Sequence, residues 1–468
     1  MMRVPSFRLR LIPCATALAL SMASASGAET VFTPVSKAAE GQIRAASATQ
    51  GQPLYKGGKA VIGGEGMVPG QEITLMRSTT VLNPDAPLVV DAEGKFSFEM
   101  AVDADAVPGL QPILVVAEKP AAAQVVTLKI SPQVPVAGAE NFDIASGPVT
   151  RGLYQVAYSK ASGVVFVASA VGRPPVKESA LVKIDAKTLE VLASVTPAAA
   201  PARADGTEGG VFAVYGVAVD DSNGTVWVTN TRQNTIAVYR QSDLSLIRQF
   251  EPGTVNHARD VVIDEGRGRA YASATRTGNI EVFDLKTLEK LEPIVIASGK
   301  RGDDFSAMAL DIDTAAGKLV NVSMSTDEAA VVDLASGQTR VIPLPGARGA
   351  SGVAYDAQEG LIFVASQQSD NLLIVKAETG EILHDVPVGA QPLNVTFDPV
   401  GRLAYVANRG AGTIAVVDTA GRIVANIDAG NLPNQLRADG EGNVWAVNKS
   451  RGENDPQGDR IWRLRPVK

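Results

Sequence analysis

Residues 393–430 alternate hydrophobic and polar positions with a period of two. Four short runs follow one another there, at 394–397, 403–408, 413–418 and 423–427. Each run sets β-branched or aromatic residues beside small ones, and each is closed by a cluster of Asp, Gly, Asn or Pro. This pattern predicts four antiparallel strands joined by tight turns. One such sheet is too narrow to be stable alone, so it needs copies packed against it.

The copies are present along the chain. The first predicted strand and its turn recur as YQVAYSKASG, YGVAVDDSNG, RDVVIDEGRG, SAMALDIDTAAG, SGVAYDAQEG, LNVTFDPVG and NQLRADGEG, starting at Tyr154, Tyr215, Arg259, Ser306, Ser351, Leu393 and Asn434. A repeat of about 40–47 residues with four strands per unit is typical of propeller blades. The sequence therefore predicts an all-β protein whose main domain, residues 138–468, is a seven-bladed β-propeller.

The last repeat is one strand short, because only IWRLRPVK follows its second strand. The run NFDIA at 141–145 precedes the first repeat and has no partner of its own. We expect it to supply the missing outer strand and to close the ring, which leaves no long unpaired edge. A plain linker at this position is the alternative.

The repeats also resemble a known family. Units such as GVAVD followed by TVWVTN and TIAVYR, and NVTFD followed by LAYVAN and TIAVVD, resemble the YncE/YVTN family of bacterial seven-bladed β-propellers over residues 141–468. The resemblance implies the propeller fold. It also brings in functions found among such propellers, which are periplasmic DNA binding, lactonase or lyase activity and a role as quinoprotein components. A shared fold does not choose among them.

Residues 1–28 have the pattern of a secretory signal peptide. Arg3, Arg8 and Arg10 precede an apolar stretch at 11–22, and small residues follow it. The apolar stretch is too short for a stable membrane anchor, and no other stretch reaches transmembrane length. We therefore expect a periplasmic or secreted protein without a transmembrane anchor. Cys14 is the only cysteine, so the exported chain would form no disulfide.

Two segments separate the predicted signal peptide from the propeller. Residues 29–54 are rich in Ala, Ser, Thr and Gln without a period, which predicts an extended or mobile segment. Residues 55–137 show strand-like alternation, and GEGMVPGQEITL resembles the opening of bacterial immunoglobulin-like sandwich modules. A small immunoglobulin-like β-sandwich is therefore predicted, joined to the propeller through the Pro-rich stretch 131–138.

Propeller geometry divides the turns between two faces. The turns after the second strands, and the connections into the next first strands, share one face that gathers cations, aromatic residues and amides. The candidate ligand-binding residues there are Tyr154, Tyr215, Arg232, His257, Arg259, Arg276, Phe305, Arg348, Asn394, Arg409, Asn434 and Lys449. Guanidinium groups bind carboxylates and phosphates in bidentate fashion, so this face predicts an anionic small molecule, a peptide or a partner protein as ligand. Acidic residues interrupt the set, and a mixed polar face without a ligand is the alternative.

Two other functions stay open. Single-stranded DNA could meet the arginines with phosphates and the aromatic rings with bases. The formal net charge of −7, which becomes −10 once the three arginines of residues 1–28 are removed, opposes phosphate-driven affinity. A lactonase or lyase would need a base, for which His257 beside Arg259 and Asp260 is the candidate.

Metal and cofactor chemistry has little support in the sequence. The chain has only two histidines, and no phosphate-binding loop or nucleophile elbow is found. We predict no catalytic residue, no metal and no cofactor. The favoured interpretation is an exported, non-catalytic propeller that binds an anionic ligand or partner protein at its Arg-rich face.

Overall fold

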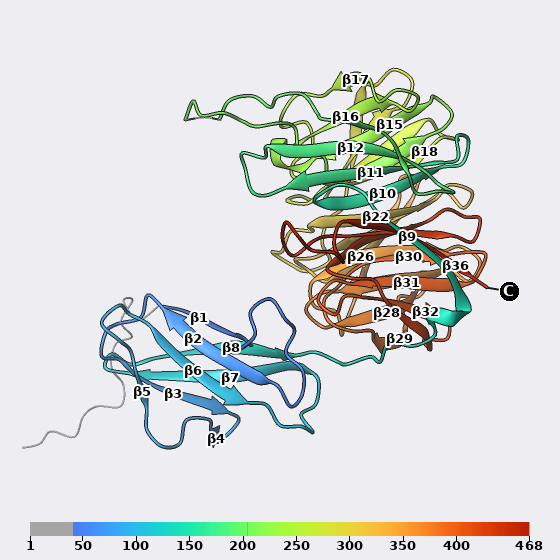
Figure 1. Ribbon diagram of the computed structural model, residues 1–468. Coiled ribbons are helices and arrows are strands. Elements are labelled where there is room, and N and C mark those ends of the chain that lie inside the picture. Colours follow the sequence, from blue (N-terminus) through green and yellow to red (C-terminus); the bar gives the residue numbers. More distant parts are fainter. Residues whose placement is uncertain (1–40, 204, 468) are drawn as a thin grey trace, which may run out of the picture.

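The computed structural model describes residues 41–203 and 205–467, and strands dominate this part of the chain (Figure 1). The predicted signal peptide, and residues 29–40 of the segment after it, lie outside the described residues. Figure 1 shows a small N-terminal domain beside a larger ring of sheets. Within the described residues, no helix has the length and apolar character needed to cross a bilayer.

The N-terminal domain consists of two facing sheets. The first joins β1 (Gln42–Ser47), β2 (Lys59–Glu65) and β6 (Phe96–Ala101). The second joins β4 (Thr80–Val81), β3 (Glu72–Arg77), β7 (Gly109–Glu118) and β8 (Ala122–Ile130), with β5 (Leu88–Val89) also paired to β3. One hydrophobic core, which includes Ile62, Ile73 and Ile113, lies between them. The domain is thus a β-sandwich.

The sandwich begins earlier than the sequence predicted. Strand β1 pairs along its whole length with β2, although residues 29–54 were expected to precede the domain. Ile43 and Ala45 pack against the core, while Gln42 and Arg44 face outward. The period of two is therefore present in β1, but it is carried by one isoleucine and small residues, which made the segment look featureless.

The larger domain is a ring of seven four-stranded antiparallel sheets within the described residues. The first four sheets are β10 (Leu153–Ser159), β11 (Val164–Val171), β12 (Glu178–Asp185), β13 (Val191–Val195); β14 (Val217–Asp220), β15 (Thr225–Asn230), β16 (Thr235–Arg240), β17 (Leu246–Gln249); β18 (Ala258–Asp264), β19 (Arg269–Ala274), β20 (Asn279–Asp284), β21 (Lys290–Val295); and β22 (Ala307–Asp313), β23 (Lys318–Ser323), β24 (Glu328–Asp333), β25 (Thr339–Pro343). A short 3-10 helix, η3 (Thr231–Gln233), forms the turn between β15 and β16.

The remaining three sheets complete the ring. They are β26 (Ala350–Asp356), β27 (Leu361–Ser366), β28 (Asn371–Lys376), β29 (Ile382–Pro387); β30 (Pro392–Asp398), β31 (Leu403–Asn408), β32 (Thr413–Asp418), β33 (Ile423–Asp428); and β34 (Pro433–Ala438), β35 (Val444–Asn448), β36 (Arg460–Pro466), β9 (Phe142–Pro148). Another 3-10 helix, η2 (Ala139–Asn141), leads into β9. The prediction of an all-β propeller is confirmed.

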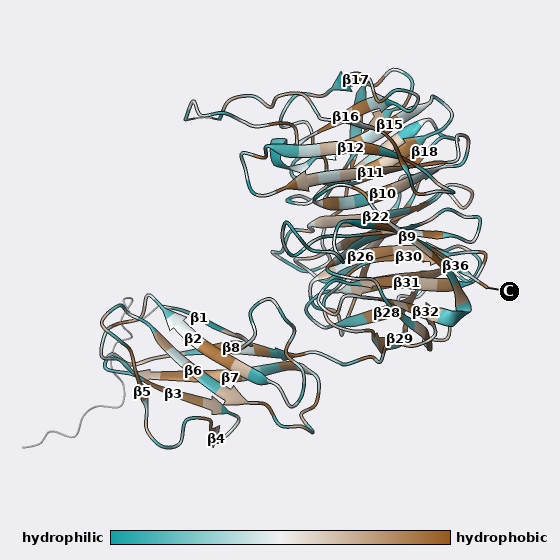
Figure 2. Cartoon of the chain, in the orientation of Figure 1, coloured by the Kyte–Doolittle hydropathy of each residue, from teal (hydrophilic) through white to brown (hydrophobic). Residues whose placement is uncertain are grey.

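A hydrophobic cluster fills the space between each pair of neighbouring sheets. The cluster between the first and last sheets joins Val165 and Val167 of β11 to Trp445 of β35, so packing continues around the whole ring. Figure 2 shows the hydrophobic positions in the middle of the ring's strands and the hydrophilic ones gathered at the turns. Each sheet therefore buries both faces against its neighbours, as the narrow predicted sheets required.

The ring is closed by a strand from the other end of the domain. β9 pairs antiparallel with β36, from Phe142 opposite Pro466 to Pro148 opposite Arg460. The side chain of Phe142 is buried and meets Tyr405 edge-on, with ring centroids 6.2 Å apart. The prediction that residues 141–145 complete the last sheet is confirmed, and the linker alternative is wrong.

The sandwich touches the propeller at a few polar points. Lys129 at the end of β8 forms an ion pair with Asp370, with Nζ and Oδ1 2.8 Å apart, and donates to the carbonyl of Gln367. Asn426 of β33 donates to the carbonyl of Val134 in the linker. These contacts place the sandwich beside the turn between β27 and β28, on the side of the ring away from the C-terminus (Figure 1).

Candidate functional site

The face of the ring that carries the second-to-third-strand turns and the entries to the first strands is called the mouth face below. A cavity of about 140 Å³ opens there, and six of the seven sheets contribute to its wall, so it lies on the axis of the ring. Its lining residues are Tyr154, Gln155, Tyr215, Thr231, Arg232, His257, Arg259, Asp260, Ala309, Asn394, Asn434 and Gln435.

The innermost strands deliver these side chains through β-bulges. The pairing of β10 with β11 shifts register around Tyr154, and that of β18 with β19 shifts around Arg259 and Asp260. Similar shifts occur in β30 and in β34, where Asn434 lies at the bulge. A bulge adds one residue and redirects its side chain. The repeat thus places one extra side chain from most first strands at the mouth.

His257 has a left-handed backbone with φ of 50°, a conformation rare for a residue with a side chain. Its N–H donates to Asn234 Oδ1 at 2.8 Å, and its carbonyl accepts from Thr275 Oγ1 at 3.1 Å. Gln391 and Leu432 have the same conformation immediately before β30 and β34. This backbone conformation recurs where the chain enters a first strand, so it is a structural feature of the repeat and does not indicate a function for His257.

Amide and carboxylate side chains in the first strands connect neighbouring sheets. A first strand has one edge without a strand partner, so its backbone N–H groups need other acceptors. The bonds that supply them are Gln155 Oε1 with Val217 N–H (3.1 Å), Asp260 Oδ2 with Leu310 N–H (3.0 Å), Asn394 Oδ1 with Leu436 N–H (3.0 Å) and Gln435 Oε1 with Val156 N–H (2.9 Å). These oxygens hold the ring together and are not free for a ligand.

Tyr154, Tyr215 and Arg232 form one wall of the cavity, and Lys449 lies against that wall. The rings of Tyr154 and Tyr215 meet edge-on with centroids 4.3 Å apart. Lys449 Nζ lies 3.2 Å from the centroid of the Tyr154 ring, and Arg232 Nε donates to the hydroxyl of Tyr215 at 3.2 Å. Arg409 Nη1 donates to Asn434 Oδ1, whose amide nitrogen in turn donates to the carbonyl of Tyr154. Asn434 therefore positions Arg409.

The inner cations of the mouth face are not neutralised by carboxylates. In the part of the chain that the structure describes, no Asp or Glu oxygen lies within 4.0 Å of a side-chain nitrogen of Arg232, Arg259, Arg276, Arg409 or Lys449. Burial lowers the pKa of Arg259, of Arg409 and of Lys449. For Lys449 the pKa falls to about 7, with Arg409 and Arg232 adding to the effect of burial. The protonated forms of these groups are therefore destabilised until an anion joins them.

The same surroundings act on His257 and Tyr154. Burial, followed by Arg276, Arg232 and Arg259, lowers the pKa of the His257 imidazole, so the neutral form is favoured. Burial, followed by Tyr215, raises the pKa of the Tyr154 phenol to about 12, so it keeps its proton at neutral pH. Among the described residues His257 forms hydrogen bonds through its backbone N–H and carbonyl, and its imidazole forms none. No carboxylate there orients the imidazole as a general base requires.

A compensated ion cluster lies below the cavity. Asp260, which lines the cavity, approaches Arg437 Nη2 at 3.4 Å, and Arg437 Nη1 lies 3.9 Å from Asp311. Asp311 also accepts the N–H of Tyr355 at 2.9 Å. Burial raises the pKa of Asp311 to about 6 although Arg437 opposes the shift. Because Arg437 is shared by these two carboxylates, the negative charge of Asp260 is partly balanced from below.

The structure brings together most of the predicted site residues. Tyr154, Tyr215, Arg232, His257, Arg259, Asn394 and Asn434 line the cavity, while Arg409 and Lys449 contact its lining. Arg276 is exposed beside them and acts on His257 electrostatically.

Two predicted residues lie elsewhere. Phe305 is only 2% exposed and packs with Ile280 and Ile296 in the core between the third and fourth sheets, because the connection before β22 folds inward there. Arg348 lies at the outer rim, with Nη1 3.6 Å from Asp327 Oδ2. The expectation that both face the ligand site is wrong.

Beyond the twelve candidate residues, the cavity is lined by Gln155, Thr231, Asp260, Ala309 and Gln435. Asp260 was noted in the sequence beside His257, and Gln435 is one of the amides expected on this face. Gln435 stands out because its side chain is 3% exposed and its amide nitrogen is buried without a hydrogen-bond partner among the described residues. A buried donor without an acceptor costs about 1–3 kcal/mol, so an acceptor from a ligand would stabilise it. Its place at the entry to a first strand, among the amides of the mouth face, was the signal available in the sequence.

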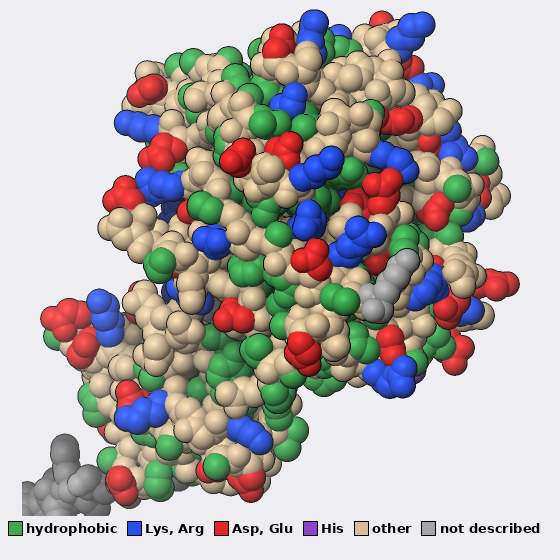
Figure 3. All heavy atoms as spheres, turned by 45° about the vertical axis from the view of Figure 1, so that its right-hand side comes forward, with side chains coloured by type: hydrophobic (Ala, Val, Ile, Leu, Met, Phe, Trp, Pro, Cys, Tyr) green, Lys and Arg blue, Asp and Glu red, His purple; other side chains and the backbone are tan. Residues whose placement is uncertain are grey.

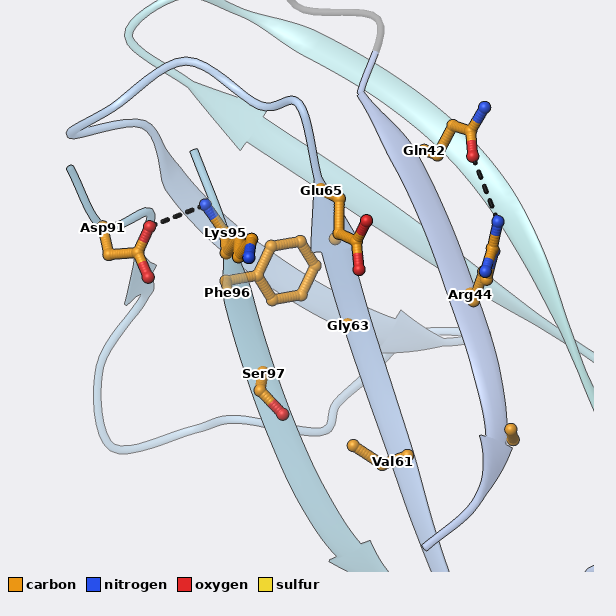
Figure 4. A pocket seen from close by; sticks show the side chains of 11 residues that line it. Gln42, Arg44, Val61, Gly63, Glu65, Asp91, Lys95, Phe96 and Ser97 are labelled. Carbon is orange, nitrogen blue, oxygen red and sulfur yellow. Dashed lines mark hydrogen bonds between the residues drawn. The ribbon is translucent and has the colours of Figure 1, made fainter. Parts of the chain in front are cut away.

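A second hollow lies on the sandwich, on the outer face of the sheet β1-β2-β6 (Figure 4). Figure 4 shows Arg44 donating to Gln42, and the backbone N–H of Lys95 donating to Asp91. Glu65 lies between these pairs, so the hollow mixes both signs of charge. The mouth of the propeller is therefore the better anion site. No group of His, Cys, Asp and Glu side chains in the described residues could hold a metal ion.

Comparison with known proteins supports the fold. No protein-family profile matches the chain. The chain is similar to the "Uncharacterized protein YncE" of Salmonella typhimurium strain LT2 and of Salmonella typhi, each 22% identical over 319 residues, which cover 65% of this chain and 84% of the relative. This similarity agrees, at low identity, with the resemblance carried by the repeats.

Solved structures with the same architecture include two enzymes. Hydrazine synthase of Kuenenia stuttgartiensis aligns with a TM-score of 0.50 and 17% identity, covering 64% of this chain and 92% of that chain. Virginiamycin B lyase from Staphylococcus aureus aligns with a TM-score of 0.53 and 13% identity, covering 70% of this chain and all (100%) of that chain. At such identities the likeness concerns the propeller fold alone.

Proposed function

We propose that this protein binds a small anionic molecule at the mouth of its propeller and that it does so without catalysis. The observation that carries the proposal is the group of inner cations, above all Arg259, Arg409 and Lys449, none of which forms an ion pair within 4.0 Å with a carboxylate of the described residues, although Asp260 and Asp459 act on Arg259 and Lys449 from further away. A unit charge about 4 Å from an opposite charge gains on the order of 4 kcal/mol at an effective dielectric constant of about 20. An incoming carboxylate or phosphate would provide that partner.

The size of the cavity limits the ligand. It measures about 140 Å³, whereas pockets for drug-sized ligands span roughly 300–1,000 Å³. On the same measure, one water needs roughly 10–15 Å³. The space suits a compact metabolite with a carboxylate or phosphate, and the buried amide of Gln435 offers it one further donor. A peptide or partner protein could place only one acidic group there.

The alternative functions have less support. Tyr215 is 7% exposed and meets Tyr154 edge-on, so the two rings do not offer open faces on which bases could stack. His257 lacks an orienting carboxylate in the described part of the chain, which weakens the proposal of a lactonase or lyase. The pattern of residues 1–28 supports export to the periplasm or beyond, and we propose that location.

The test is calorimetric titration of the full chain with small anions such as lactate, citrate and inorganic phosphate. Arg259→Met should weaken binding at least tenfold without lowering the midpoint of unfolding, because it removes a cation that has no partner. The matched control is Arg267→Met on the other face, where Arg267 is already paired with Asp264 at 2.9 Å. It should leave anion binding unchanged.

Three results would argue against the proposal. Equal anion affinities of Arg259→Met and wild type would show that Arg259 does not bind the anion. Tight binding of a single-stranded oligonucleotide with a steep fall at high salt would favour the nucleic-acid alternative. Turnover of a lactone that disappears in His257→Ala would favour the enzyme.

A further inference from the structure

Lys449 is a cation of the mouth face whose amine has no ion-pair partner among the described residues. It immediately follows β35, and its backbone N–H donates to the carbonyl of Leu432 at 3.1 Å, so the start of its loop is fixed. The amine lies on the face of the Tyr154 ring, which is a wall of the cavity. Among the described residues no carboxylate lies within 4.0 Å of the Lys449 amine, and the amine makes a cation–π contact with the Tyr154 ring.

The charged groups that act on the Lys449 amine are mostly cationic. Arg409 disfavours its protonation, the carboxylate of Asp459 favours it, and Arg232 adds a smaller unfavourable effect. With a pKa of about 7, about half of the Lys449 side chains carry a free amine at neutral pH. An ordinary lysine at that pH has on the order of one free amine in 2,500. Desolvation beside other cations is a known way to make a lysine nucleophilic.

We propose that Lys449 forms a Schiff base with a small anionic carbonyl compound, such as a 2-oxo acid, held at the mouth of the propeller. The inference rests on the proposed function, because the arginines must first hold the anionic group. The surroundings that bind a carboxylate therefore also present a free amine to a carbonyl carbon next to it.

The step is a condensation and needs no oxidant or reductant. The amine nitrogen bonds to the carbonyl carbon as the C=O π bond breaks, and one proton passes from the nitrogen to the oxygen to give a neutral carbinolamine. The hydroxyl then takes one proton from solvent and leaves as water while the nitrogen lone pair forms the C=N bond, and the resulting iminium can return its remaining N–H proton to solvent. The product is a cationic iminium when protonated, and the face of Tyr154 that now holds the ammonium would hold it as well.

The experiment treats the full chain with pyruvate or glyoxylate and then with sodium borohydride, which reduces an imine to a stable amine. Intact mass and peptide mapping then locate the adduct. We expect Lys449 to be modified at least tenfold more than any other lysine, and lactate to compete. The rate should rise with pH up to about 7 and then level off, whereas an ordinary lysine continues to gain reactivity up to its usual pKa near 10.4.

Controls separate this inference from the proposed function. Lys449→Arg keeps the cation but cannot form an imine, so it should give no adduct, and the anion site itself is judged from lactate binding to the wild type. Acetone, which has a carbonyl but no charge, should modify Lys449 far less than pyruvate. If lactate binds to wild type but the adduct is absent, or is spread over exposed lysines such as Lys160, the Schiff base is wrong and the anion site stands. If lactate does not bind at all, both are wrong.

Discussion

The two faces of the propeller both carry many cations, but they differ in whether those cations are paired with carboxylates. On the face where the chain ends, cations and carboxylates alternate (Figure 3). Their ion pairs are Lys160–Glu441, Arg267–Asp264, Arg269–Asp284, Lys318–Asp333, Arg402–Asp356 and Arg422–Asp418. On the mouth face, Arg232, Arg259, Arg276, Arg409 and Lys449 have no such partner among the described residues, whereas Arg348 at the outer rim pairs with Asp327.

This difference separates structural charge from charge available to a ligand. On the C-terminal face each of the cations named above forms an ion pair with a carboxylate of the protein. An exposed pair of this kind stabilises the folded state by about 0–1 kcal/mol. An unpaired, partly buried cation at the mouth opposes folding until an anion arrives. The two faces differ in whether their cations have carboxylate partners, because both faces contain arginines.

The largest expected effect is on the C-terminal face. Arg402 donates to both oxygens of Asp356, which is 2% exposed, and to Glu359. Arg402→Ala leaves the Asp356 carboxylate buried without its cation, and we expect it to lower the free energy of unfolding by about 3 kcal/mol. Denaturant titration measures this. Arg422→Ala is the control, since Arg422 is 80% exposed and its loss should cost less than about 0.5 kcal/mol. Equal losses would mean that burial of the pair does not matter.

The next effect is the pH dependence of anion binding. An anion favours protonated Lys449, whose pKa in the free protein is about 7, so lactate affinity should be constant below pH 7 and decline above it. A fall of about tenfold is expected between pH 6 and pH 8, since each pH unit beyond the free pKa loses up to a factor of ten. Isothermal titration at several pH values measures it, and Lys449→Met should flatten the profile. Affinity that increases with pH would contradict the assignment.

The smallest effect marks the outer limit of the site. The side chain of Arg348 is 64% exposed and pairs with Asp327 at 3.6 Å. Arg348→Ala should change the free energy of unfolding by less than about 0.5 kcal/mol and leave lactate affinity within twofold of wild type. Calorimetric titration and denaturant unfolding check both. A large loss of affinity would extend the binding surface to the rim.

The ring was predictable because its signal is repeated. In the repeat at 393–430 the predicted strands at 403–408 and 413–418 match β31 and β32 residue for residue. The closing strand was predictable for a related reason, because a missing strand in the last repeat requires a donor. β1 was missed because Ile43 is its only large apolar residue and the small alanines beside it give little contrast.

The site was only partly predictable. The topology of a propeller brings the starts of the first strands to one face, which is why Tyr154, Arg259 and Asn434 were found. A bulge has no clear sequence signature, so Gln155, one residue beyond Tyr154, was not found, and Gln435 was recognised only as an amide of the mouth face. Phe305 precedes β22 as Tyr215 precedes β14, but the Phe305 ring packs into the core between the third and fourth sheets. Whether a cation has a partner depends on contacts between distant sheets.

The pairing of β9 with β36 has a consequence for biosynthesis. β9 leaves the ribosome before the other strands of the ring, while β36 is made after all of them. Domains generally fold as units during synthesis, so the nascent ring keeps two open edges until β36 has been made. A message cut short anywhere before Arg460 yields a product that cannot seal. The exposed strand edges would mark that product for chaperones and proteases.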